Sequence, residues 1–311
     1  MYYPQNNVPL QRKSKPREMK IQKPQYEIWL QKPGELGIYQ QIERAGRVCY
    51  KSEKNTTEDS AKPFVGRMIE HEHFAMLEHG TVYLTCLHNI LPHYATNKFS
   101  RVNTIDEKDY ITTNLRVLAE NKWLDDMKYL SDYEKGKHEL RITVHFTTQI
   151  AITREYNRHR ANSMAEQSTR YCNYSKDKFD KEISINLPTW VEAEEGYKDL
   201  GIDEYTFPRM TAEIAGGISD KEWGKLEYWL YANLAAEFAY MKLTEAGCKP
   251  QEARVVLPLD TNTELVHTAF VSDWQHFFDL RALGTTGAPH PDAKVLAEPL
   301  YEEFKAKEYI K

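Results

Sequence analysis

The chain has 311 residues, of which 41% are hydrophobic and 12% aromatic, so it can bury a sizeable core. No apolar run approaches the roughly 20 residues that a membrane-spanning helix needs, and no signal peptide is recognisable, so we expect a soluble, cytoplasmic protein. The formal net charge of −5 disfavours binding to long nucleic acid, which depends on a basic surface.

The four cysteines are far apart and form no Cys-x-x-Cys pair, which argues against a disulfide framework or a zinc ribbon. Basic residues are concentrated in residues 1–24, where apolar residues are few. This composition predicts a flexible basic arm, either solvated or in contact with a neighbouring subunit or an acidic partner. The rest, residues 25–311, has no repeats and no clean boundary, and we expect it to form one domain.

The first elements are predicted from their periodicity. Residues 26–30 indicate a strand that ends at Pro33-Gly34, and apolar residues at helical spacing indicate helices around 38–49 and 64–69. Alternation predicts a strand at 81–87. Residues 88–138 are polar and irregular, with a short helix from Leu115 to Leu130 capped by Thr113 or Asn114.

The middle of the chain leads into a charged segment. Alternating apolar residues over 140–146 predict a half-buried strand. Thr147 or Thr148 is expected to cap a helix that continues through Arg160, with Arg154 and Arg158 one turn apart on one face.

The last elements complete an α+β pattern. Residues 174–222 are variable, with a strand candidate at 182–187. A long helix with a core face that includes Trp223 and Phe238 ends at Gly247. Residues 263–270 predict a strand, and Ser272 is expected to cap a helix leading to Arg281. We therefore expect a twisted, mainly antiparallel sheet flanked by helices.

The segment Arg158–Tyr171 carries three arginines, a histidine, a carboxylate, two serines, a threonine and a tyrosine within fourteen positions. Arginine offers a planar fork of donors that remains charged at any working pH, so paired arginines hold a phosphate dianion well. Met164, Ala161 and Ala165 are interleaved with the charges, which favours a polar site set into the fold over a solvated basic face. The segment is typical of a nucleotide site.

Five histidines between positions 71 and 93 suggest a metal site, but their spacing does not match one. On a helix, His71 and His73 would point in divergent directions, and no His-x-x-x-His pair accompanies them. We predict no metal.

Four ordered motifs resemble those of the flavin-dependent thymidylate synthases. Arg158-His159-Arg160, seven further residues, and Ser168-Thr169-Arg170 resemble the family signature. The stretch 73–79 resembles its upstream His-Glu-Ser/Thr-Pro-x-Glu-His element, residues 253–259 its Ala-Arg-x-x-Leu-Pro stretch, and residues 279–281 its late Leu-Arg. Together the motifs span about two thirds of the chain. Against this family, residues 88–138 and 174–222 are insertions.

The resemblance implies an activity and its co-substrates. The family converts dUMP to dTMP with methylenetetrahydrofolate as carbon donor and NADPH-reduced FAD as hydride source, and its members are homotetramers with sites between subunits. A nearer rival activity is flavin-dependent transfer of hydroxymethyl. A different class, a nucleic-acid-binding protein that uses the Arg-His-Arg segment, is disfavoured by the acidic net charge.

The resemblance also implies roles for particular residues. The expected flavin-binding residues are His73, Ala75, Arg158, His159, Arg160, Glu166 and His276. The expected dUMP-binding residues are Arg154, Glu155, Arg158, Glu166, Gln167, Ser168, Thr169, Arg170, Arg254 and Arg281. Ser168 is expected at the phosphate and Arg281 at N3 of the uracil, and these two are the expected catalytic residues.

Five positions depart from the family pattern. Glu155 stands where compact members have Gln, and Phe270 and His276 where flavin-facing Asn residues are expected. Ala165 and Cys49 replace Asn and Ser. The contacts to the flavin edge are therefore less well defined by the sequence than the phosphate site. Asn114 and Arg116, within the first insertion, are further candidates to reach the site.

Overall fold

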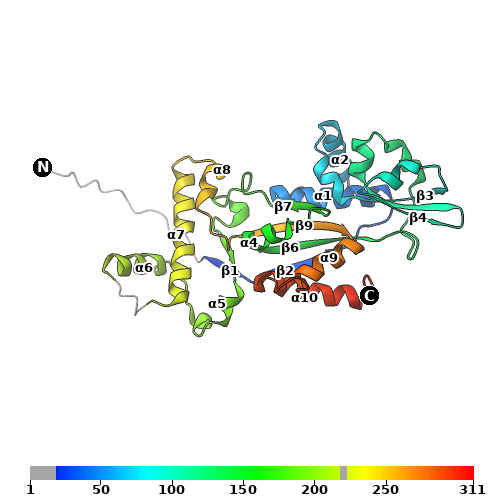
Figure 1. The fold of residues 1–311 in the computed structure, drawn as a ribbon. Coiled ribbons are helices and arrows are strands. Elements are labelled where there is room, and N and C mark those ends of the chain that lie inside the picture. The colour runs from blue at the N-terminus through cyan, green and yellow to red at the C-terminus, as the bar shows by residue number, and fades with distance from the viewer. Residues whose placement is uncertain (1–18, 218–222) are drawn as a thin grey trace.

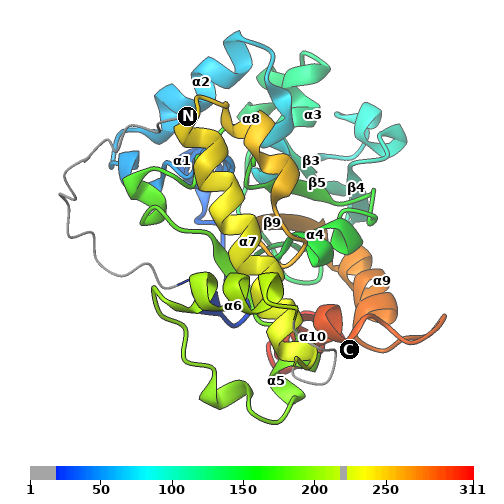
Figure 2. The same cartoon turned by 90° about the vertical axis from the view of Figure 1, so that its left-hand side faces the viewer.

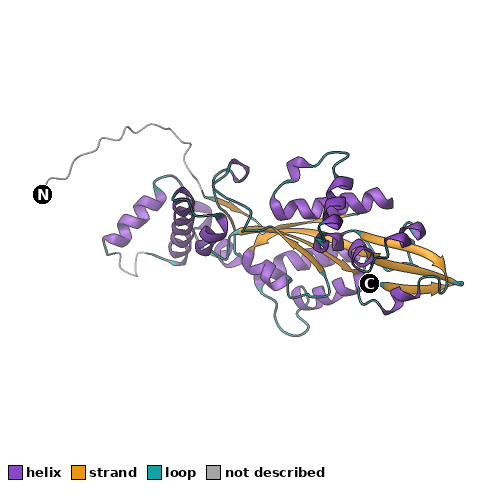
Figure 3. Ribbon diagram, turned by 90° about the horizontal axis from the view of Figure 1, so that it is seen from above, coloured by secondary structure: helices purple, strands orange, loops and turns teal. Residues whose placement is uncertain are grey.

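The computed structural model describes residues 19–217 and 223–311. The molecule is elongated, with a central sheet, a smaller sheet at one end and a group of helices at the other (Figure 1). The α+β class and the mainly antiparallel sheet are as predicted. The strands run along the length of the molecule, with helices on either side (Figure 3). Within the described residues, no helix is long and apolar enough to cross a membrane.

The central sheet has the order β2-β6-β9-β7, and all its neighbours are antiparallel. Its longest pairing joins β6 to β9, with Arg141 opposite Phe270 and Gln149 opposite Asn262. The end of β6, where α4 begins, therefore lies beside the start of β9, and the start of β6 lies beside the end of β9, where α9 begins. The strands are β2 (Gln25–Trp29), β6 (Arg141–Gln149), β9 (Asn262–Phe270) and β7 (Ser163–Glu166).

Helices cover both faces of this sheet. On one face Phe146 packs in a large aromatic cluster with Trp274 and Phe277. On the other face Ala45 and Val48 pack against the sheet. The covering helices are α4 (Ile150–Tyr156), α9 (Val271–Arg281) and α10 (Pro291–Ala306) on the first face and α1 (Gly34–Tyr50) on the second.

The expectation of a half-buried strand at 140–146 is therefore wrong. The polar side of β6 faces α1 and the 3-10 helix η2 (Phe74–His79) instead of solvent. Its side chains bond to neighbours: Thr143 and Thr268 join their hydroxyls at 2.8 Å, and Thr268 Oγ1 lies 2.8 Å from His79 Nδ1. Internal hydrogen bonds offset the cost of burying such groups.

The smaller sheet, β3-β5-β4, contains the predicted strand 81–87 and a hairpin that was not predicted. The hairpin lies within 88–138, so that segment is not irregular. Its turn consists of Asp106 and Glu107, both with positive φ (47° and 59°), as a two-residue type I′ turn requires. The elements here are β3 (Thr81–Leu87), β4 (Arg101–Ile105), β5 (Lys108–Asn114), α2 (Ala61–Glu70) and α3 (Leu115–Glu120).

Asn114 caps α3, as predicted, by accepting a hydrogen bond from Val117 N at 3.2 Å. The helix is shorter than expected and ends at Glu120, and a 3-10 turn, Leu124–Tyr129, follows. The predicted cap at Ser272 is wrong, because Phe270 is the N-cap of α9 and Ser272 lies in its first turn, where its hydroxyl bonds to Glu139.

The opposite end has its own apolar cluster around α7, which crosses the front of the view in Figure 2. Met19 is buried there and β1 pairs with β8, so residues 19–22 belong to the fold and not to a flexible arm; residues 1–18 lie outside the described residues. Phe238, predicted in the core, is 52% exposed. The elements are β1 (Lys20–Gln22), β8 (Ser184–Asn186), α5 (Thr189–Ala193), α6 (Thr206–Ala215), α7 (Lys225–Glu245) and α8 (Pro250–Ala253).

Candidate functional site

The charged segment 158–171 is a reversal between two elements and not the end of a helix. Helix α4 stops at Tyr156, and Thr147 and Thr148 belong to strand β6, so the predicted helix through Arg160 is wrong. The chain turns at Arg158–Arg160 and returns as β7 along β9. As a result, the arginines of this segment point into three separate hollows.

The first hollow, which we call the loop pocket, has a volume of about 620 Å³ and lies where the chain leaves β7. Arg254 donates from Nη1 to Thr169 Oγ1 at 3.2 Å, and Arg170 N donates to Ser168 Oγ at 3.3 Å. Arg154 is exposed and forms no ion pair with the described residues. Seven expected site residues line this pocket: Arg154, Glu166, Gln167, Ser168, Thr169, Arg170 and Arg254.

Glu166 fixes the start of this loop to α4. Its carboxylate accepts hydrogen bonds from Thr153 Oγ1 at 2.6 Å and from Asn157 Nδ2 at 2.9 Å. Among the described residues, Glu166 is the one carboxylate in the lining of the loop pocket, against the three arginines Arg154, Arg170 and Arg254. The loop pocket therefore presents cations and hydroxyls toward a ligand, which suits an anion.

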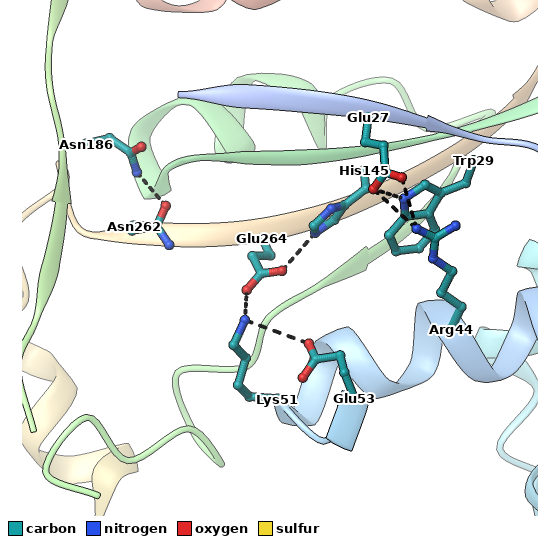
Figure 4. A network of polar contacts seen from close by, with 9 residues as sticks. All are labelled: Glu27, Trp29, Arg44, Lys51, Glu53, His145, Asn186, Asn262 and Glu264. Carbon is teal, nitrogen blue, oxygen red and sulfur yellow. Dashed lines mark hydrogen bonds and ion pairs between the residues drawn. The ribbon is translucent and has the colours of Figure 1, made fainter. Parts of the chain in front are cut away.

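The loop rests on the network of polar contacts shown in Figure 4. Lys51, just after α1, pairs with Glu264 of β9, and Glu264 also bonds to His145 at 2.8 Å. The same strand holds the loop directly, because Gln167 N donates to the backbone oxygen of Glu264 at 2.8 Å. Ser168 N donates to Cys49 O at 2.9 Å. The end of α1 and strand β9 thus fix the backbone on which Ser168 is carried.

Lys51 and Glu264 keep their charges in this network. Burial acts to lower the pKa of Lys51, but the neighbouring Glu264 carboxylate outweighs it and the pKa is raised. Burial acts to raise the pKa of Glu264, but the hydrogen bond from His145 and the charge of Lys51 outweigh it and the pKa is lowered. The pair is a charged clasp beneath the loop.

The second hollow, the Arg281 pocket, has a volume of about 470 Å³. Arg281 donates from Nη1 to Glu155 Oε2 at 2.7 Å, from Nη2 to Glu155 O at 2.8 Å and from Nε to His159 Nε2 at 3.2 Å. Arg158 and His276 also line it, so five expected residues meet here. A positive guanidinium is thereby held in one orientation at the edge of an open pocket.

His159 is neutral in this arrangement. Burial, and then the charges of Arg281, His276 and Arg158, lower the pKa of His159 to about 4. Because its Nε2 accepts from Arg281, the ring carries its proton on Nδ1. His159 therefore orients Arg281 without competing with it for an anion.

The third hollow, the hairpin pocket, has a volume of about 370 Å³ and lies between segment 158–171 and the unpredicted hairpin. Arg160, Ala161 and Ser163 form one wall. Residues between 98 and 120 form the opposite wall, and the candidates Asn114 and Arg116 are part of it. The other lining residues are Glu78, Lys98, Phe99, Arg101, Val117, Glu120, Arg141, Ala269, Phe270 and Asp273.

His73 and Ala75 lie apart from these hollows. Within the described residues, neither lines any of the three pockets. His73 is exposed before the 3-10 helix η2, and its ring centroid is 6.3 Å from that of His71. Among the described residues there is no group of three potential metal ligands.

Four residues that line these pockets or support their walls were not predicted from the sequence: Lys51, Glu264, Arg101 and Arg141. Lys51 and Glu264 are separated by 213 positions, and each is an ordinary surface residue by type. The one available signal was the polar alternation along β6, which includes Arg141. If β6 is taken to be buried on both faces, the same alternation predicts a layer of polar side chains inside the protein.

Comparison with known proteins gives a family for this chain. The sequence profile of the family described as "Thymidylate synthase complementing protein" matches residues 122–308. A flavin-dependent thymidylate synthase from Thermosipho melanesiensis is 27% identical over 144 residues, which are 45% of this chain and 53% of that protein. The chain thus spans about half the length of this curated relative.

Two solved structures of the UMP/dUMP methylase PolB from Streptomyces cacaoi, bound with 5-Br dUMP and with 5-Br UMP, are each 15% identical to this chain. Both alignments cover 93% of this chain, and they cover 93% and 92% of the two solved chains. The TM-scores are 0.40 and 0.43.

Proposed function

The chain belongs to the thymidylate synthase complementing protein family, and on this basis we propose that it is a flavin-dependent thymidylate synthase. In the proposed reaction, dUMP, methylenetetrahydrofolate and reduced FAD give dTMP, tetrahydrofolate and oxidised FAD, and NADPH reduces the flavin again. The proposal extends to a homotetramer in which sites form between copies.

The observation that carries the proposal is that Arg154, Arg170 and Arg254 line the loop pocket together with Ser168 and Thr169. Three guanidiniums and two hydroxyls in a hollow suit the phosphate of a nucleotide. The site is concave, whereas a protein that binds along a nucleic-acid backbone needs an extended basic surface. Ser168 is proposed as a phosphate ligand.

Arg281 is the proposed electrostatic catalyst. Negative charge grows on N3 and the carbonyl oxygens of uracil as the ring is activated, and a guanidinium already held in place stabilises that charge without reorganising. Glu155 and His159 hold Arg281 in one orientation. In this chain they are positioning residues for Arg281.

The residues also fit a flavin nucleotide. The hairpin pocket contains five cations against three carboxylates, and Arg141 Nε is buried there without a hydrogen-bond partner. When bound, the flavin supplies the hydride. Arg160 of this pocket is proposed to hold it, together with Arg158, His159 and His276 of the Arg281 pocket and Glu166 of the loop pocket. His73 and Ala75 are proposed to join them from a neighbouring copy, because within one chain they lie outside the pockets.

An anaerobic turnover with dUMP, methylenetetrahydrofolate and NADPH, followed by mass spectrometry of the nucleotide product, tests the proposal. We expect yellow protein and a product heavier than dUMP by one methylene group. A product heavier by a hydroxymethyl increment would instead establish the hydroxymethylase activity. Colourless protein that binds neither FAD nor dUMP would refute the proposal.

A further inference from the structure

Lys51 ends helix α1 in an uncommon backbone conformation and turns its side chain back into the fold. Its φ of 48° and ψ of 56° lie in the left-handed region, which lysine seldom adopts. Its ammonium pairs with Glu264 of β9, which lies 213 positions further along the chain. The side chain of Glu264 is 10% exposed and that of Lys51 is 32% exposed. Water and salt therefore screen this pair less than they screen a surface pair.

The loop that carries Ser168 is held by hydrogen bonds from two consecutive backbone amides. Gln167 N donates to the backbone oxygen of Glu264 at 2.8 Å, and Ser168 N donates to the backbone oxygen of Cys49 at 2.9 Å. The first acceptor belongs to strand β9 and the second to the last turn of α1. The position of the Ser168 backbone therefore depends on how that strand and that helix end are placed relative to each other.

The ion pair between Lys51 and Glu264 fixes this placement. Cys49 and Lys51 are separated by one residue, so the acceptor of the Ser168 amide and the partner of Glu264 lie on the same turn of chain. The ion pair, the two backbone hydrogen bonds and the short stretches of chain between them form a closed ring at the start of the loop. We call it the loop ring. Its side-chain link is the ion pair, and its other two links are backbone hydrogen bonds.

The carboxylate of Glu264 is held in one orientation within the loop ring. One oxygen accepts from Lys51, and the other lies 2.8 Å from Nε2 of His145 on the neighbouring strand β6 (Figure 4). The ring of His145 is itself stacked on Trp29, with the ring centroids 4.7 Å apart. Packing on the side of β6 thus keeps the carboxylate directed at Lys51.

We propose that Lys51 is a positioning residue for the phosphate of dUMP and that it acts through Glu264 on the backbone of Ser168. Neither Lys51 nor Glu264 lines the loop pocket, so their effect reaches the substrate through the loop. The inference rests on the proposed function, because that function assigns Ser168 to the phosphate. It concerns the affinity for dUMP and not the chemical step, since Arg281 lies in a different pocket.

The variant that tests the proposal is Lys51→Met, which keeps the length of the side chain and removes its charge. Lys122→Met is the matched control, because Lys122 is also in the left-handed region (φ 63°) but is exposed and forms no ion pair with the described residues. By calorimetry, we expect dUMP to bind on the order of tenfold more weakly to Lys51→Met and unchanged to the control. Deoxyuridine, which lacks the phosphate, should bind all three proteins equally. Lys51→Arg, which can still pair with Glu264, should recover most of the loss.

Turnover and hydrogen exchange separate positioning from a general loss of structure. In Lys51→Met, the KM for dUMP should rise on the order of tenfold, while kcat at saturating dUMP stays within a few-fold of wild type. Without ligand, the amides of residues 166–172 should exchange faster than in wild type, and this increase should exceed any increase in strands β3 and β5, which lie outside the loop ring. An equal increase throughout the protein would make Lys51 a structural residue and overturn the inference.

Glu264→Gln decides the case in which Lys51→Met does not fold. Glutamine keeps the volume and can still bond to His145, but it removes the charge that attracts Lys51, so dUMP binding should weaken here as well. Because both changes open the same ring, the double variant should lose little more than the weaker-binding single variant, whereas fully additive losses would count against the ring.

The inference and the proposed function fail in different ways. Wild-type dUMP affinity in both Lys51→Met and Glu264→Gln would overturn the inference and leave the proposed function standing. If the wild-type protein itself bound no dUMP, the proposed function would be refuted, and hydrogen exchange of residues 166–172 would still decide whether Lys51 holds the loop.

Discussion

Arg281 donates two hydrogen bonds to Glu155, one to the carboxylate at 2.7 Å and one to the backbone oxygen at 2.8 Å. The proposed electrostatic catalyst is therefore partly neutralised by an adjacent negative charge that compact members of the family, which have Gln here, would lack. The side chain of Arg281 is 12% exposed and that of Glu155 is 34% exposed, so solvent screens the pair only in part.

The first prediction is that Glu155→Gln strengthens dUMP binding. Glutamine can still accept from Arg281 but removes the competing charge, so the guanidinium acts more strongly on the uracil carbonyls and on the charge that develops there. We expect dUMP to bind several-fold more tightly by calorimetry, with dTMP formation at least as fast. Glu302→Gln, on the exposed side of α10, is the control. Weaker binding in Glu155→Gln would mean that Glu155 contacts the substrate directly.

The second prediction separates binding from chemistry at Arg281. Lysine keeps the charge but loses the planar fork, so Arg281→Lys should bind dUMP within about tenfold of wild type. Its rate of methyl transfer should fall on the order of a hundredfold or more, which is the effect of removing one oxyanion-type donor. Flavin reduction by NADPH, followed by stopped flow, should persist. Methyl transfer within a few-fold of wild type would make Arg281 a structural residue.

The third prediction concerns the phosphate. Arg254→Ala removes one charge-assisted donor from the loop pocket, a loss of about 1.5–3 kcal/mol or roughly 10- to 150-fold in dUMP affinity. Deoxyuridine, which lacks the phosphate, should bind the variant and the wild type equally. Arg67→Ala, an exposed arginine on α2, is the matched control. An unchanged dUMP affinity in calorimetric titration would remove Arg254 from the site.

The fourth prediction is a loss of stability in mild acid. Burial lowers the pKa of His79 to about 3 and that of His267 well below its usual value, and the pKa of His159 is lowered to about 4. The unfolded chain, with a histidine pKa of about 6.5, binds these protons first. Stability is therefore fully present above about pH 6.5 and declines as the pH falls toward 4, by about 1.4 kcal/mol per pH unit for each proton.

Urea unfolding between pH 7 and pH 4.5 measures this decline. His79→Gln should reduce the slope of stability against pH by about one proton, whereas His71→Gln, an exposed histidine, should not change it. A slope that is the same in His79→Gln and wild type would show that His79 is not buried in its neutral form.

Local patterns predicted most of the central elements. Strands 26–30, 81–87 and 263–270 and the long helices are close to their expected positions, because hydrophobic periodicity survives in each. The hairpin is not predicted because its turn is Asp106-Glu107. Both residues adopt the left-handed conformation, but their sequence lacks the Asn-Gly or Asp-Gly pair by which such a turn is recognised. Arg158–Arg160 was assigned to a helix because its residue types allow one, while the return pairing of β7 on β9 is a long-range contact.

The resemblance pointed to residues that line hollows in the structure but not to how those hollows are arranged. Arg254 and Arg281 each line a hollow, yet nothing in the local sequence indicates that the two hollows are different. The clasp between Lys51 and Glu264 and the buried charge of Arg141 depend on which strands become neighbours. That information appears only once the sheet has formed.

The β4-β5 hairpin is closed by a two-residue turn and contributes its side of the hairpin pocket from one short stretch of chain. The opposite wall comes from elements that build the central sheet. This division lets the pocket-facing residues of the hairpin be changed without altering the strands of the central sheet. One wall of the pocket can therefore vary as a single short module while the other stays fixed.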